Sequence, residues 1–351
     1  MARRVRAVGP WPPRVTTVRP PRGQEIPRVA YRVTVHERPP APDTPGTVVA
    51  RRPRSRGWTV AACAVVALAC AVGVWLLWRT FVDTWAGQRV EDAALDGATT
   101  GQGHLWRVAE PVLDVVSVGF VAGGLLAAAG VALVRRRWSL ALQVAVLVGG
   151  ANLTTRLVKY EVLQRPVLGV GADYGNTLPS GHTTAAGSVA AALLLVVPPR
   201  ARPAVAVLGA AYTAATGVST LVGQWHRPSD VVAGALVVLG WTAVVCAAMV
   251  LRPARTATAT ATFRRVDRSD PWRARTRRTA LALVVVGVAA GGVATVLLTR
   301  TWAYRAGATS RADEMLAYGG GVAGVVAACS LAFALMLVLR HVAGARAETP
   351  A

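Results

Sequence analysis

Residues 175–188 read G-N-T-L-P-S-G-H-T-T-A-A-G-S, a polar, turn-forming passage that opens directly into an apolar, alanine-rich run. Pro179 and Gly181 favour a turn, and Ser180 is a good N-terminal cap for a helix. His182 then falls in the first helical turn, beside backbone N–H groups that lack partners within the helix. A helix start of this kind favours an anion, and an imidazole there can exchange protons with it. Taken alone, the stretch is equally consistent with a capped helix that carries an incidental histidine.

The apolar run after this stretch is one of several in the chain. Of the 351 residues 53% are hydrophobic, and the mean hydropathy is +0.42. Runs of 16 to 23 residues carry almost no charge, which is typical of helices that span a membrane. The sequence therefore predicts an all-α, polytopic membrane helix bundle with eight spans, at about 59–78, 112–134, 138–158, 182–198, 204–222, 231–251, 280–299 and 319–339.

The net charge of +22 is typical of proteins that bind nucleic acid, but the distribution of this charge along the chain is not. Residues 1–56 hold 13 arginines against 3 acids, 252–278 hold 9 arginines against 2 acids, and short links at 135–137 and 200–202 hold the rest of the excess. These segments alternate with uncharged or mildly acidic links, which is the positive-inside pattern of a multi-pass membrane protein. We expect a cell-membrane protein with both termini in the cytosol, anionic lipid headgroups at the basic segments and no nucleic acid.

The same pattern divides the chain into parts. The Arg- and Pro-rich composition of the first part favours a disordered cytosolic tail. The four cysteines lie inside apolar runs without the spacing of metal ligands, so we interpret them as packing residues. The expected parts are the tail at 1–56, a six-span core at 57–251, a basic cytosolic linker at 252–278, a two-span C-terminal hairpin at 279–340 and a cytosolic tail at 341–351.

Two further polar segments lie on the predicted outer side. The first follows the third span and contains Lys159, the only lysine among 39 basic residues, together with Arg156 and Arg165. Because lysine and arginine are not interchangeable, a lysine kept here indicates a need for a compact charge. A cation that extends from a helix end to the membrane surface is the alternative.

The second polar segment, 219–230, places His226 and Asp230 four residues apart. A carboxylate at that spacing can accept the imidazole N–H, fix the tautomer and make the other nitrogen more nucleophilic. The alternative is an interfacial histidine near a helix-starting aspartate. Two histidines, a carboxylate, basic groups and a helix start on one side of the membrane together form a set suited to phosphoryl transfer without a metal.

The segments K-Y-E-V-L-Q-R-P, P-S-G-H and S-T-L-V-G-Q-W-H-R-P-S-D resemble the three signature motifs of the type 2 phosphatidic acid phosphatase superfamily. That family includes membrane lipid phosphatases and is similar in its site to vanadium haloperoxidases. The resemblance implies that His226 attacks phosphorus to give a phosphohistidine, that Asp230 orients it and that His182 protonates the leaving group. It implies no cofactor and no metal. The phosphate oxygens would be held by Lys159, Arg165 and the backbone amides of Ser180 and Gly181.

The chain departs from the family pattern in two places. Five residues rather than the usual six separate Lys159 from Arg165, and Thr220 stands where the third motif usually has an arginine. One cation of the phosphate clamp is therefore missing. Arg227 or Arg156 is our hypothesis for its replacement, since Arg156 lies one helical turn from Lys159.

The resemblance leads us to expect an integral membrane phosphatase with an extracytoplasmic active site. It would hydrolyse a lipid phosphate or diphosphate on the outer face through a phosphohistidine. Phosphatidic acid, phosphatidylglycerol phosphate, polyprenyl diphosphate and prenyl-linked sugar phosphates are the substrates that the resemblance implies. The alternative, which Thr220 keeps open, is a non-catalytic transporter or scaffold that binds an anionic lipid headgroup.

Overall fold

The computed structural model describes residues 56–100, 102–115, 138–171, 175–252, 271–307 and 310–347, together with 123 and 130. Within these ranges the chain forms nine α-helices, two short π-helical turns and no strand, which confirms the all-α prediction. The expected disordered tail, most of the predicted span 112–134, the middle of the basic linker and the last four residues lie outside the described residues.

Six of the described helices are long and apolar enough to cross a membrane, so the chain is a multi-pass membrane protein. The predicted span 182–198 corresponds to α6 (Gly181–Val196), which is apolar but has only 16 residues. That length corresponds to about 24 Å of helix. The six longer helices are α1 (Arg56–Leu77, extended by η1, Trp78–Val82), α5 (Trp138–Leu157, extended by η2, Val158–Val162), α7 (Arg202–Val222), α8 (Pro228–Leu251), α9 (Pro271–Tyr304) and α10 (Arg311–Ala347).

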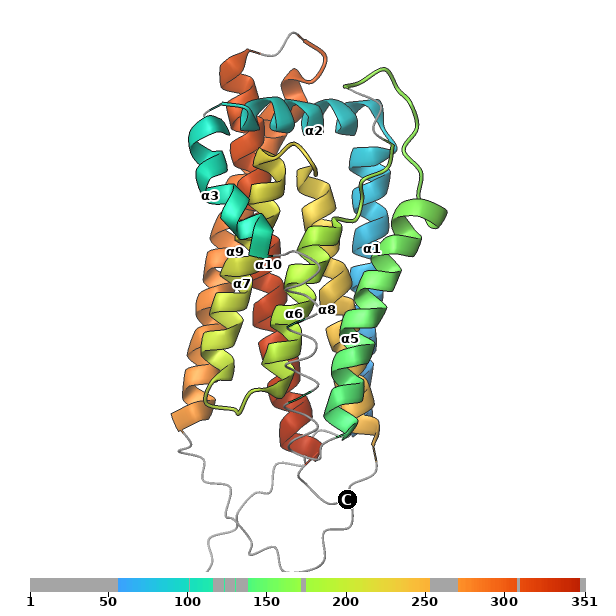
Figure 1. Ribbon diagram of the computed structural model, residues 1–351, viewed down its shortest axis with the longest axis vertical. Helices are drawn as coiled ribbons and strands as arrows, with labels where there is room; N and C mark the ends of the chain where they lie inside the picture. The colour runs from blue at the N-terminus through green and yellow to red at the C-terminus, as the bar shows by residue number, and fades with distance from the viewer. Residues whose placement is uncertain are drawn as a thin grey trace, which may run out of the picture. The chain divides into compact units, whose positions relative to one another are not determined.

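The link between the predicted spans 59–78 and 112–134 is mostly helical. It forms α2 (Trp85–Ala98) and the start of α3 (Gln102–Val115), and α2 lies across one end of the other helices (Figure 1). Thr84 caps α2 by accepting a hydrogen bond from the Gly87 amide at 3.0 Å. A Cβ on Gly97 would lie 2.1 Å from the carbonyl oxygen of Glu314. The absence of a side chain at Gly97 therefore allows α2 to approach α10 this closely.

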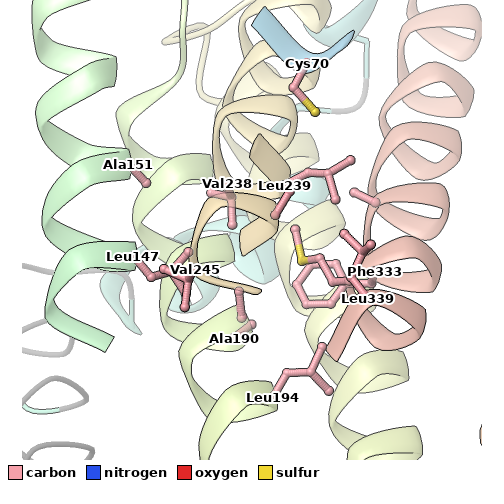
Figure 2. Close-up of a cluster of buried hydrophobic side chains, with 14 of the residues drawn as sticks. Cys70, Leu147, Ala151, Ala190, Leu194, Val238, Leu239, Val245, Phe333 and Leu339 are labelled. Carbon is pink, nitrogen blue, oxygen red and sulfur yellow. The ribbon is translucent and has the colours of Figure 1, made fainter. Parts of the chain in front are cut away.

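The centre of the bundle is α8, which packs against α1, α5, α6 and α10. In its most apolar window 61% of the residues are buried, against 17% in α1 and in α9, so the outer helices present apolar side chains where lipid is expected. Figure 2 shows part of the core cluster, in which buried side chains of α1, α5, α6, α8 and α10 meet. Because α10 packs on α7 and α8 as well as on α9, the division into a six-span core and a separate hairpin stays a prediction.

Close contact between α8 and the start of α6 depends on Gly234. A Cβ at this position would lie 3.0 Å from the carbonyl oxygen of Ser180 and 3.2 Å from the hydroxyl of Thr184. We expect Gly234→Ala to push the two helices apart and to cost about 1–3 kcal/mol of stability, as overpacking does. If the chain is the phosphatase that the sequence predicts, the variant should also release phosphate more slowly. Thermal unfolding and turnover of the purified variant measure both effects.

Gly292→Ala is the matched control, because a Cβ there meets nothing within 4 Å. It should leave turnover unchanged and the melting temperature unchanged or slightly higher, since alanine favours helix. Equal behaviour of the two variants would contradict the tight α6–α8 contact.

Candidate functional site

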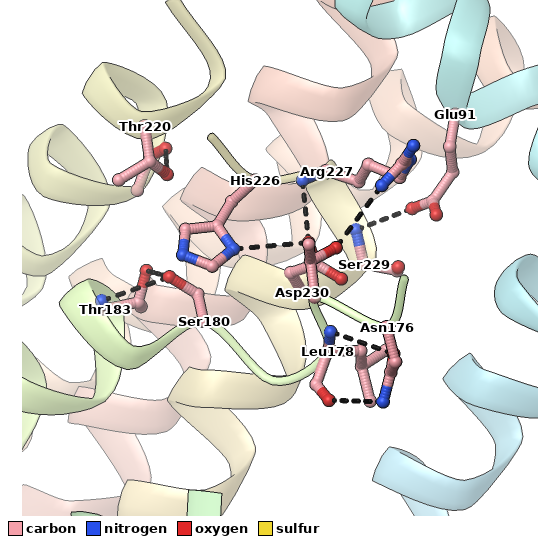
Figure 3. Close-up of polar contacts among 12 residues, drawn as sticks. Glu91, Asn176, Leu178, Ser180, Thr183, Thr220, His226, Arg227, Ser229 and Asp230 are labelled. Carbon is pink, nitrogen blue, oxygen red and sulfur yellow. Dashed lines mark hydrogen bonds and ion pairs between the residues drawn. The ribbon is translucent and has the colours of Figure 1, made fainter. Parts of the chain in front are cut away.

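Three segments far apart in the sequence meet at the bundle end that α2 crosses (Figure 1). They are η2 with the residues just after it, residues 175–180 with the first turn of α6, and the turn between α7 and α8. The side chain of Asn176 bonds to both of the first two, and Figure 3 shows its two hydrogen bonds with Leu178. Its amide nitrogen lies within 3.2 Å of three carbonyl oxygens and its oxygen accepts the Leu178 amide, so one residue fixes both the end of η2 and the entry to α6; the three carbonyls are those of Lys159, Leu163 and Leu178.

The first turn of α6 is capped as the sequence predicted. The Ser180 hydroxyl accepts hydrogen bonds from the amide of Thr183 at 3.3 Å and from its hydroxyl at 3.1 Å. The amide of Ser180 donates to the backbone carbonyl of Asp230 at 2.8 Å, so the expectation that this amide holds phosphate oxygens is corrected. Within the described part of the chain the amides of Gly181 and His182 have no such acceptor, and a Cβ built on Gly181 meets only open space.

His226 and Asp230 form the pair that their spacing predicted. The Nδ1 atom of His226 lies 3.4 Å from Oδ2 of Asp230, and this oxygen also accepts the Arg227 amide at 2.9 Å. His226 is 5% exposed and Asp230 is fully buried. Figure 3 shows one ring nitrogen of His226 directed toward Asp230 and the other away from it. That arrangement leaves the second nitrogen free to act as a nucleophile.

The structure brings the two histidines together. The ring centroids of His182 and His226 are 5.8 Å apart, with an interplanar angle of 67°. The ring centroid of Trp225 lies 5.4 Å from that of His182, and Trp106 contacts Trp225 in turn. Sequence reasoning did not identify either tryptophan, although Trp225 stands next to His226 in the third motif.

Two guanidinium groups, those of buried Arg227 and half-buried Arg165, lie near the His226–Asp230 pair. Arg227 is 3% exposed and donates from Nη1 to the hydroxyl of Thr177 at 3.3 Å. Its Nε and the Nη2 of Arg165 are buried, and neither has a hydrogen-bond partner among the described residues. Burial, and then the charge of Arg227, lower the pKa of Arg165, which stays a cation because arginine titrates far above neutral pH. Buried donors without acceptors are rare and require an explanation.

The remaining residues of interest lie in different surroundings. Lys159 is half-buried and Arg156 is exposed, and their charged groups lie 5.6 Å and 5.7 Å from the centre of the Tyr160 ring. Lys159 is close enough to His182 for the two side chains to interact electrostatically. Thr220 is fully buried and its hydroxyl donates to the carbonyl of Gly217 at 2.7 Å. The side chain that stands in the usual arginine position is thus engaged with its own helix.

The structure adds one ionisable residue that sequence reasoning missed. Glu91 on α2 is 2% exposed, and its Oε1 accepts the amide of Ser229 at 2.9 Å. Burial, and then the charge of Asp230, raise the pKa of Glu91 to about 7. In the sequence it was one of several acids in the link after the first span, and nothing distinguished it from its neighbours.

Among the described residues, no group of three or more histidine, cysteine, aspartate or glutamate side chains lies together as metal ligands do. The four cysteines are buried and free, as expected for packing residues. The described side chains and backbone at the site offer two imidazoles, carboxylates, cations and amides.

Comparison with known proteins gives one match. No curated protein and no solved structure matches the chain. The model of the PAP2 superfamily matches residues 140–257, a region that contains all three motifs and every catalytic and phosphate-binding residue expected from the sequence. This match covers about a third of the chain and, over these residues, confirms the resemblance to the type 2 phosphatidic acid phosphatases.

Proposed function

We propose that this chain is an integral membrane phosphatase that hydrolyses a lipid phosphate or diphosphate on the outer face of the membrane through a phosphohistidine. The observation that carries the proposal is the approach of His182 and His226, whose ring centroids are 5.8 Å apart. Beside them lie two guanidinium groups, each with one buried nitrogen that has no hydrogen-bond partner among the described residues. A phosphorus atom between the two rings has a nucleophile on one side and a proton donor on the other.

The first half-reaction uses one imidazole for each role. Asp230 accepts a hydrogen bond from the Nδ1–H of His226, so that Nε2 carries the lone pair that attacks phosphorus. The new P–N bond forms as the bond from phosphorus to the leaving oxygen breaks. His182, in its protonated form, gives its proton to that oxygen, and the alcohol leaves.

The second half-reaction reverses these roles. Neutral His182 takes a proton from a water molecule, and the water oxygen attacks the phosphorus of the phosphohistidine. The P–N bond breaks, its electrons return to Nε2 of His226, and inorganic phosphate leaves. His182 is then protonated and His226 neutral, as at the start of the cycle.

The negative charge on the phosphate oxygens needs donors that are already in position. The unpaired Nη2 of Arg165 and Nε of Arg227 are buried beside the His226–Asp230 pair, and the Gly181 amide adds a donor at the start of α6. Lys159 contributes its charge near His182. Arg227 takes the role of the arginine that the family usually has at the position of Thr220. The hydroxyl of Thr220 is bonded to Gly217, and Arg156, the other candidate, is exposed.

A lipid substrate is supported by the position of the site at the end of apolar helices. The outer faces of α1 and α9 carry exposed hydrophobic side chains such as Leu68 and Val285, which are 66% and 59% exposed. An acyl or prenyl tail can therefore stay in the bilayer while its headgroup enters the site. The outer-face orientation is supported by the positive-inside rule, because every basic segment then lies in the cytosol.

A phosphate-release panel tests this function. Detergent-purified protein should release phosphate from lipid phosphates or lipid diphosphates and act poorly on water-soluble phosphate esters with the same headgroup. A protein that only binds headgroups releases phosphate from none of them, and that result would refute the proposal.

Removal of divalent metal should leave the rate unchanged. The proposed steps use imidazoles for proton transfer and attack, and cationic side chains for the phosphate oxygens, so no step depends on a metal ion. The measurement is turnover in the presence and absence of a chelator, with a metal-dependent phosphatase as the positive control for chelation. Loss of turnover that returns when a metal is added back would contradict the mechanism.

A further inference from the structure

Glu91 is a buried carboxylate that the proposed reaction does not use. It lies on α2, outside the motif segments, yet its Oε1 accepts the Ser229 amide at 2.9 Å (Figure 3). Its Oε2 is buried without a hydrogen-bond partner among the described residues. A buried carboxylate oxygen without a donor is costly, so its presence next to the site requires an explanation.

The Ser229 amide belongs to the first turn of α8, between Arg227 and Asp230. Helix starts leave amides without intrahelical partners, and an acceptor side chain at the N-cap normally satisfies one of them. The N-cap residue of α8 is Arg227, whose guanidinium has donors only. Glu91 supplies the missing acceptor from another helix, so α2 holds the first turn of the helix that carries Asp230.

We propose that Glu91 is a positioning residue for this site, and that its ionisation weakens the attraction of Arg227 and Arg165 for the substrate phosphate. This inference rests on the proposed function, because it assumes that the guanidinium groups of Arg165 and Arg227 bind the substrate phosphate. An ionised Glu91 is a second anion beside the same cations, so it competes with the substrate for their charge. A protonated Glu91 still accepts the Ser229 amide and does not compete.

The charges around Glu91 come from each element next to it in the site. Asp230 on α8 opposes its ionisation, whereas Arg227 at the start of α8 favours it. Arg165, on the segment after η2, also interacts with Glu91 through its charge. With burial as the largest cause, the pKa of Glu91 is raised to about 7, so its protonation state changes in the neutral range.

The test compares wild-type protein with Glu91→Gln. Glutamine keeps an oxygen that can accept the Ser229 amide and never ionises. Inorganic sulfate is the probe, because its charge does not change in this range, and calorimetry gives its Kd without any need for turnover. We expect equal Kd values at about pH 6, and at about pH 8 a Kd at least about fivefold lower for Glu91→Gln than for wild type. A ratio that stays the same at both pH values would overturn the inference.

A second variant separates positioning from titration. Glu91→Ala removes the acceptor for Ser229, so at about pH 6 its kcat should fall at least about tenfold while Glu91→Gln keeps the wild-type kcat. The control is Glu110→Gln, which changes an exposed carboxylate and should change neither Kd nor kcat. A wild-type kcat in Glu91→Ala would refute the positioning role.

The two proposals fail in different ways. Wild-type protein without turnover on any lipid phosphate refutes the proposed function, and the sulfate titration still decides whether Glu91 controls anion binding. Turnover in wild type with a pH-independent Kd ratio leaves the proposed function in place and refutes the control by Glu91.

Discussion

Replacement of His226 with alanine is expected to lower kcat for phosphate release by at least about 10⁴-fold, because loss of the nucleophile removes the covalent route altogether. The His226 side chain is 5% exposed and lies 3.4 Å from Asp230. Among the described histidines only His182 is near enough to take its place. Single-turnover kinetics with a phosphorus-labelled substrate measure both the rate and the phosphohistidine, which should be absent from the variant.

His341→Ala is the matched control. It lies next to Arg340, whose guanidinium binds the Leu195 carbonyl at the far end of α6 from Ser180, and it should keep wild-type turnover.

Asp230→Asn should retain the shape of the site and lose about 10²–10⁴-fold in kcat, since an amide does not fix the same tautomer. Phosphate release by His226→Ala within tenfold of wild type would remove the basis of the mechanism.

Arg227→Ala is expected to lower kcat/KM by about 10²–10³-fold, which is the usual cost of one donor to a transition-state oxyanion. Its Nε is buried without an acceptor in the described part of the chain, and Thr220 is unable to compensate because its hydroxyl bonds to Gly217. Initial rates over a range of lipid substrate concentrations give the value, and a thermal melt shows whether the variant folds.

Arg156→Ala is the control for the same charge change. Its guanidinium is exposed and lies against the Tyr160 ring at 5.7 Å, so kcat/KM should stay within about twofold of wild type. The opposite ranking of the two variants would assign the missing cation to Arg156 instead.

The apolar runs predicted most of the fold because a span needs a long uncharged segment, and that property is visible in the sequence alone. Six of the eight predicted spans are membrane-length helices, and α6, with 16 residues, matches the short span predicted at 182–198. The helix α2 was not predicted. Its packing depends on Gly97, which lies against the backbone of Glu314, a contact between residues more than two hundred positions apart that no local pattern reports.

The site was predictable only where chemistry and spacing coincide. His226 and Asp230 are four residues apart in one motif, so their pairing could be inferred from the sequence. Glu91 and Asn176 act through long-range contacts to Ser229 and Leu163, and such residues look like ordinary polar side chains until the fold is known. The Ser180 amide was misjudged for the same reason, because its acceptor belongs to Asp230 on another helix.

The gathering of all three motif segments at one end of the bundle has a consequence for the bilayer itself. For a lipid substrate, a protein inserted in a single orientation removes headgroup charge from one leaflet and leaves the other untouched. Hydrolysis therefore generates lipid asymmetry, and complete conversion of a vesicle's substrate requires that lipids cross between the leaflets.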